Sequence, residues 1–133
     1  MNKITRRTLV RSGGVAATAV TLNLGAFAEG NMLEEQAGNV FHVFAFQWKP
    51  DVTVAQKDRA ARDIAAFQGQ IPGLLETHVG SNLSPRGKGY TFGGVMRFTA
   101  PAALDAYTHH PMHLALLAWL VPLIDAIELD LHA

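Results

Sequence analysis

Residues 40–48, VFHVFAFQW, carry the strongest structural signal in the chain. Aromatic and β-branched residues fill this stretch, as is typical of a β-strand. Successive side chains of a strand point to opposite faces of the sheet, so His42, Phe44 and Phe46 share one face. Phe41 and Val43 lie on the other. Because both faces are largely apolar, the pattern predicts a central strand that is covered on both sides.

A capping box marks the start of the first expected helix. The Thr53 hydroxyl can cap the helix, and the Gln56 side chain can reach back to the Thr53 backbone amide. Apolar residues then recur every three or four positions, as on the buried side of an amphipathic helix. We expect the helix to run to about Gly69. Its predicted buried stripe is Ala60, Ile64, Phe67 and Ile71.

The rest of the chain predicts three more strands and two more helices. A polar turn separates strand patterns at residues 74–82 and 90–99, which are expected to form an antiparallel hairpin. Pro101 and Pro111 each suit the first position of a helix, and Pro122 closes the second one. Alternating apolar and polar residues predict a last strand over residues 124–132. We expect the second of these helices to bury Leu114, Leu117 and Leu120, with Ala118 and Val121.

The order β-α-β-β-α-α-β predicts the α+β class. It is the order of a ferredoxin-like fold, a four-stranded antiparallel sheet with helices on one face. Phe41 and Val43 would leave the second face apolar and uncovered. A second copy of the chain is the economical cover, and two such sheets packed face to face make a dimeric α+β barrel.

Residues 1–28 have the three parts of an export signal. Arg6 and Arg7 begin a motif that is similar to the twin-arginine consensus, a weakly apolar run follows, and Ala26-Phe27-Ala28 is a cleavage sequence. We expect cleavage after Ala28, a linker over residues 29–39 and a folded domain over residues 40–133. The location would be periplasmic or secreted, by the twin-arginine pathway. An uncleaved anchor is the alternative, but a span needs about 20 mainly apolar residues and this run is shorter.

Composition excludes several classes of function. The formal net charge is zero, but all four charged residues before Glu29 are basic, which leaves 7 basic and 11 acidic residues in the rest. That balance argues against nucleic acid and against a stable association with an anionic membrane. The chain has no cysteine, so disulfides, thiolate catalysis and iron–sulfur clusters are excluded.

Several short motifs occur in a fixed order from His42 onward. They are HVFAFQW at 42–48, Ile71-Pro72-Gly73, Gly80-Ser81-Asn82, Gly89-Tyr90-Thr91, and Leu104-Asp105-Ala106-Tyr107 followed by His110-Pro111 and His113. In this order and spacing the chain resembles the stress-responsive A/B barrel (Dabb) family over about residues 40–132. The resemblance implies a homodimeric α+β barrel with a ligand pocket between the sheet and the helices.

The resemblance also implies a site. A plant polyketide cyclase of this family uses a Tyr and a His as an acid–base pair, and by motif these fall on Tyr107 and His113. A pocket histidine of that enzyme falls on His42, and a further one falls on Phe92, a departure from its site. We expect His42, Tyr107 and His113 to be catalytic. The expected pocket residues are Phe44, Phe46, Phe92 and His110.

These residues suit chemistry without a cofactor. His113 would lie in the first turn of a helix, where the dipole disfavours imidazolium, and neutral imidazole is a competent general base. A Tyr107 hydroxyl can polarise a carbonyl or hold an enolate oxygen. Together they suit lyase, cyclase or isomerase-like chemistry on a small, apolar, carbonyl-bearing molecule.

Other interpretations stay open. The chain could be a non-catalytic stress-response or assembly protein in which the histidines are structural and His110 only caps a helix. Metal binding by His109, His110 and His113 is a minor alternative, because Pro111 interrupts the helical spacing between them. Haem with His113 as axial ligand is another, and no motif supports it. We therefore expect neither a metal nor another cofactor.

Overall fold

The computed structural model describes residues 40–133. The predicted signal peptide (1–28) and linker (29–39) lie outside the described residues. Among residues 40–133, no helix is both long and apolar enough to cross a membrane. The elements are β1 (Val40–Trp48), α2 (Val54–Ala65), β2 (Leu74–Ser81), β3 (Phe92–Phe98), α3 (Pro101–Thr108), α4 (Pro111–Leu120), a short 3-10 turn η1 (Val121–Leu123) and β4 (Ile124–His132).

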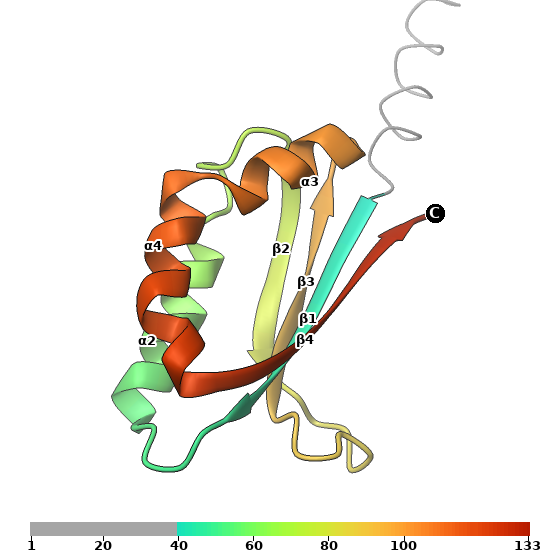
Figure 1. Cartoon of the computed structure of the whole chain (residues 1–133). Helices are drawn as coiled ribbons and strands as arrows, with labels where there is room; N and C mark the ends of the chain where they lie inside the picture. The colour runs from blue at the N-terminus through green and yellow to red at the C-terminus, as the bar shows by residue number, and fades with distance from the viewer. Residues whose placement is uncertain (1–39) are drawn as a thin grey trace, which may run out of the picture.

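The four strands form one antiparallel sheet in the order β2-β3-β1-β4. β1 is central, with β3 on one side and β4 on the other. Figure 1 shows α2, α3 and α4 together on one side of this sheet. The prediction of a ferredoxin-like α+β fold is confirmed, and each predicted element is present.

The two faces of β1 differ as its alternation predicted. Val40, His42, Phe44 and Phe46 are buried under the helices, whereas the residues between them are only half-buried. On the side away from the helices, the neighbouring strand β4 exposes a row of apolar side chains. These are Ile127, Leu129 and Leu131, at 48%, 55% and 51% exposure.

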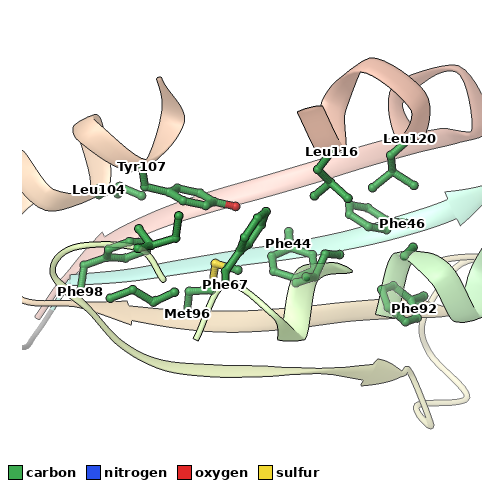
Figure 2. Close-up of a cluster of buried hydrophobic side chains, with 14 of the residues drawn as sticks. Phe44, Phe46, Phe67, Phe92, Met96, Phe98, Leu104, Tyr107, Leu116 and Leu120 are labelled. Carbon is green, nitrogen blue, oxygen red and sulfur yellow. The ribbon is translucent and has the colours of Figure 1, made fainter. Parts of the chain in front are cut away.

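An aromatic core fills the space between sheet and helices (Figure 2). Phe46 stacks on Phe44 at 5.3 Å and on Phe92 at 5.7 Å between ring centroids. Full burial of such a side chain stabilises the fold by about 1.5–3 kcal/mol. The core therefore holds the helices on this face and leaves the other face without a cover in the described chain.

Helix α2 begins as predicted and ends earlier. The Thr53–Gln56 capping box is present in both directions. The α-helix ends at Ala65, four residues before the predicted end at Gly69, because the chain turns there and Gly69 takes a φ of +81°. Phe67 and Ile71 are nevertheless buried, since the turn continues over the sheet.

The predicted buried face of α4 is partly wrong. Leu120 is buried and Leu117 is half-buried, but Leu114 and Val121 are each 52% exposed, and Ala118 is exposed as well. The sequence PMHLALLAWL is apolar on every side of the helix, so its periodicity does not identify the side that meets the sheet. Leu116, which was not predicted, takes the buried position.

Candidate functional site

His42 lies near the start of β1 on the helix side of the sheet. It is 6% exposed, and its Nδ1 lies 2.7 Å from Oδ1 of Asp130 on β4. A carboxylate can only accept a hydrogen bond, so Nδ1 carries the proton. In the neutral imidazole Nε2 therefore holds the lone pair, and Asp130 fixes this tautomer.

His113 lies in the first turn of α4 and is held by the end of α3. Its Nδ1 is 3.2 Å from the backbone oxygen of Thr108, which can only accept, so Nδ1 again donates and Nε2 is left unprotonated. Burial lowers the pKa of His113 below its ordinary value of 6.5, and the Thr108 bond opposes that shift. His113 is therefore neutral near pH 7 and its free nitrogen is basic.

Tyr107 lies in the last turn of α3 and is 3% exposed. Its ring centroid is 4.3 Å from that of His113, 5.3 Å from Phe98 and 5.8 Å from His42. Figure 2 shows the ring reaching from α3 into the interior with the hydroxyl oxygen leading. Burial raises the pKa of this phenol, and the charge of Glu128 adds to the effect, so Tyr107 stays a hydrogen-bond donor.

One cavity joins these three residues. It lies between the sheet and α4 and has a volume of about 70 Å³. Its polar lining consists of His42, Tyr107, His113 and Glu128. The other lining residues are apolar: Phe44, Phe46, Ile64, Leu116, Leu117, Leu120, Val121, Ile124 and Ala126.

Five of the seven predicted site residues therefore line this cavity, and two do not. Phe92 lies farther along β3, where its ring packs against Phe46 and Trp48 at 5.7 and 5.4 Å. His110 accepts a hydrogen bond from the Met112 backbone amide at 3.1 Å and so caps α4. This is the structural role that the sequence offered for His110 as an alternative to a pocket role. Phe92 and His110 therefore do not line this cavity together with His42, Tyr107 and His113, contrary to the expectation from the sequence.

Asp130 and Glu128 were not singled out from the sequence. They occupy alternate positions of β4, opposite His42 and Phe44 respectively, and so face the helix side. A signal for them existed, because polar residues alternate with Ile127, Leu129 and Leu131 in the last strand. Their meaning depends on the register between β1 and β4, which is a long-range pairing.

The described residues do not suggest a metal centre. Within residues 40–133, no group of three or more His, Asp or Glu side chains is arranged to hold a metal ion. The Nδ1 atoms of His109 and His113 instead meet the backbone oxygens of Asp105 and Thr108, at 2.9 and 3.2 Å. These bonds orient the two rings within α3 and α4.

Solved structures with this fold come from bacteria and plants. A Dabb family protein with a ferredoxin-like fold from Mesorhizobium loti is 26% identical, with a TM-score of 0.63 over 72% of this chain and 97% of that one. A dimeric ferredoxin-like protein of unknown function from Thermobifida fusca is 25% identical, with a TM-score of 0.63 over 71% and 90%. Hydroxynitrile lyase from Passiflora edulis is 21% identical, with a TM-score of 0.65 over 71% and 92%, and shows the fold alone.

Sequence comparison agrees with the structural likeness. No curated protein matches the chain significantly. Residues 40–131 match the family model described as the stress responsive A/B barrel domain, and this match spans most of the chain. The four-stranded sheet and its three helices have the architecture of the Dabb structure from Mesorhizobium loti. The chain therefore belongs to the stress-responsive A/B barrel (Dabb) family.

Proposed function

We propose that this chain is an exported, homodimeric Dabb-domain protein that binds a small, apolar, carbonyl-bearing molecule in the cavity between sheet and helices. We further propose that His42, Tyr107 and His113 perform acid–base chemistry on that molecule without a cofactor. The observation that carries the proposal is their convergence on one apolar cavity, with a protonated phenol beside an unprotonated imidazole nitrogen.

The proposed step is abstraction of a proton next to the carbonyl. His113 Nε2 takes the proton from carbon, and the electron pair of the broken C–H bond forms the C=C bond of the enolate. The π pair of the carbonyl moves onto its oxygen, and the Tyr107 hydroxyl hydrogen-bonds the resulting enolate oxygen. His42 Nε2 can accept or return a proton on the other side of the site. The cavity is small beside the roughly 300–1,000 Å³ of most ligand pockets, so the molecule has few non-hydrogen atoms.

The homodimer is proposed from the uncovered face of the sheet. Ile127, Leu129 and Leu131 form an exposed apolar row there, next to Phe41 and Val43. Contiguous apolar surface of this kind marks an interface. The structural relative from Thermobifida fusca is dimeric, which supports the same arrangement here.

Export is proposed from the twin-arginine motif at Arg6-Arg7 and the Ala26-Phe27-Ala28 cleavage sequence. The described elements begin with β1 at Val40, and we propose that residues 29–39 link this domain to the cleavage site. The protein would then act in the periplasm or outside the cell.

Deuterium exchange tests the chemistry without knowledge of the natural substrate. The purified protein would be incubated with acetone in D2O, and loss of the methyl protons followed by ¹H NMR. A separate assay would measure cyanide release from acetone cyanohydrin, because the Passiflora edulis relative is a hydroxynitrile lyase. We expect the wild type to exchange the methyl protons faster than buffer alone. His113→Gln and Tyr107→Phe should lose this acceleration, and His132→Gln, whose side chain is exposed, should keep it. The proposal would be refuted if the methyl protons exchanged at the rate of buffer alone and if acetone shifted no signal in the NMR spectrum of the protein.

A non-catalytic role remains the second candidate, and one observation favours it. The bond from His113 to the Thr108 carbonyl and the cap that His110 places on α4 both stabilise the α3–α4 corner. In this case His113→Gln would lower thermal stability while the wild type bound no carbonyl compound.

A further inference from the structure

Among residues 40–133, Glu128 is the one carboxylate in the lining of the cavity that holds Tyr107 and His113. It lies on β4 opposite Phe44 of β1. On the same face of β4, Ala126 lies on one side of it and Asp130, which bonds His42, lies on the other. Apart from His42, Tyr107 and His113, the remaining walls are aliphatic and aromatic. Glu128 is exposed, so water screens its charge in part, whereas the apolar walls on the cavity side screen it less than open water would.

Among residues 40–133, no lysine or arginine lines the cavity. Within the same residues the Glu128 carboxylate forms no hydrogen bond or ion pair. Burial raises the pKa of Tyr107 and the Glu128 charge adds to that shift, whereas burial lowers the pKa of His113 and the Glu128 charge opposes it.

We propose that Glu128 sets the charge specificity of the cavity, so that it accepts neutral or amine-bearing carbonyl compounds and rejects carboxylate-bearing ones such as 2-oxo acids. This inference rests on the proposed function, since it names the substrate class of the same site. A carboxylate ligand would lie close to a like charge with no cation to compensate it, whereas an ammonium group would gain an attraction.

Three probes of similar size separate the classes: 2-butanone is neutral, aminoacetone is a cation and pyruvate is an anion. Binding of each to the full chain would be followed by NMR titration of cavity signals at low ionic strength. We expect pyruvate to bind roughly tenfold more weakly than 2-butanone in the wild type. Aminoacetone is expected to bind at least as well as 2-butanone.

The variant Glu128→Gln removes the charge and keeps the side-chain size. We expect it to bring pyruvate within about twofold of 2-butanone and to weaken aminoacetone roughly tenfold relative to 2-butanone. Glu128→Ala is a second variant with the same expected order. The matched control is Asp58→Asn, which removes one exposed negative charge on α2 outside this cavity and is expected to leave the wild-type order intact.

Either of two variant results would overturn the inference while the proposed function stands. One is unchanged ratios among the three probes in both Glu128 variants, and the other is an equal change in Asp58→Asn. A wild type that binds 2-butanone and pyruvate equally well would do the same. Failure of all three probes to bind the wild type would overturn the proposed function and the inference with it, so the two failures are distinguishable.

Discussion

His42 and Asp130 are register partners across β1 and β4, and Asp130 Oδ1 accepts a hydrogen bond from His42 Nδ1 at 2.7 Å. The His42 side chain is 7% exposed and the Asp130 side chain is 57% exposed. The bond therefore joins a buried ring to a carboxylate at the edge of the sheet. Asp130 acts as a positioning residue, because it decides which nitrogen of His42 carries the proton.

The variant Asp130→Ala should change the tautomer of His42. Without the carboxylate the Nδ1 proton loses its partner, so we expect the population protonated at Nε2 to rise. The free energy of unfolding should fall by about 1 kcal/mol, since a buried donor is left unpaired while its former partner was largely solvated. Long-range ¹H–¹⁵N NMR of the imidazole measures the tautomer. Asp125→Ala is the control, because Asp125 lies on the same strand opposite Gln47; an unchanged His42 spectrum in Asp130→Ala would contradict the assignment.

The sequence predicted the fold well where local patterns carry direction. The alternation in residues 40–48 identified the buried face of β1, and the stripe through Ala60 and Ile64 identified the buried face of α2. It failed on α4, where Leu114 is exposed and Leu116 is buried. A helix that is apolar all round can pack on any side, so its orientation is set by contacts with the neighbouring helices α2 and α3.

Only part of the candidate site could be predicted from the sequence, because some of its residues come together through long-range pairing. The resemblance identified Tyr107 and His113, and their positions across the α3–α4 corner bring the two rings together. Asp130 and Glu128 entered only through the pairing of β4 with β1, which joins residues more than 80 positions apart in the case of His42 and Asp130. No local pattern reports which residue of one strand faces which residue of another.

Burial of His113 should make stability depend on pH. Its folded pKa lies below the ordinary 6.5, so the unfolded chain takes up the proton first as the pH falls. The free energy of unfolding should therefore decrease as the pH falls through about 6.5, and level off below the folded pKa. One proton limits the slope to about 1.4 kcal/mol per pH unit.

Urea denaturation between about pH 7.5 and 5.5 measures this slope, over a range above the titration of ordinary carboxylates. In His113→Gln the slope should be shallower than in the wild type. His132→Gln, which removes an exposed histidine, should keep the wild-type slope. Equal slopes in all three proteins would show that His113 titrates alike in the folded and unfolded chain.

The exposed apolar face should hold the dimer together. Leu129 is 55% exposed on the face of β4 away from the helices, and its neighbour across the strand pair is Val43. A charge at Leu129 would be buried without a partner in a face-to-face dimer, so Leu129→Glu is expected to be a monomer. Sedimentation velocity measures the change.

Leu114→Glu is the matched control for the interface. Leu114 is also a leucine, at 52% exposure, but it lies on α4 on the other side of the sheet (Figure 1). This variant should remain dimeric. Dissociation of Leu114→Glu together with an intact Leu129→Glu dimer would place the interface on the helices.

Gly94 allows β3 to approach β2 and the ring of Phe44, which lines the cavity beside His42. A Cβ at Gly94 would lie 2.5 Å from the backbone oxygen of His78 and 2.5 Å from Cζ of Phe44. Gly94→Ala should therefore cost about 1–3 kcal/mol of the free energy of unfolding, the usual range for overpacking. The Phe44 ring lines the cavity and lies 5.7 Å from the His42 ring, so its displacement should weaken ligand binding as well. Gly80→Ala tests the explanation, because a Cβ on this strand glycine meets nothing within 4 Å and should change stability by less than about 0.5 kcal/mol. Urea denaturation measures the free energy of unfolding of both variants. An equal decrease in the two would mean that any side chain added to a strand glycine destabilises the sheet and that the contact with Phe44 is not the cause.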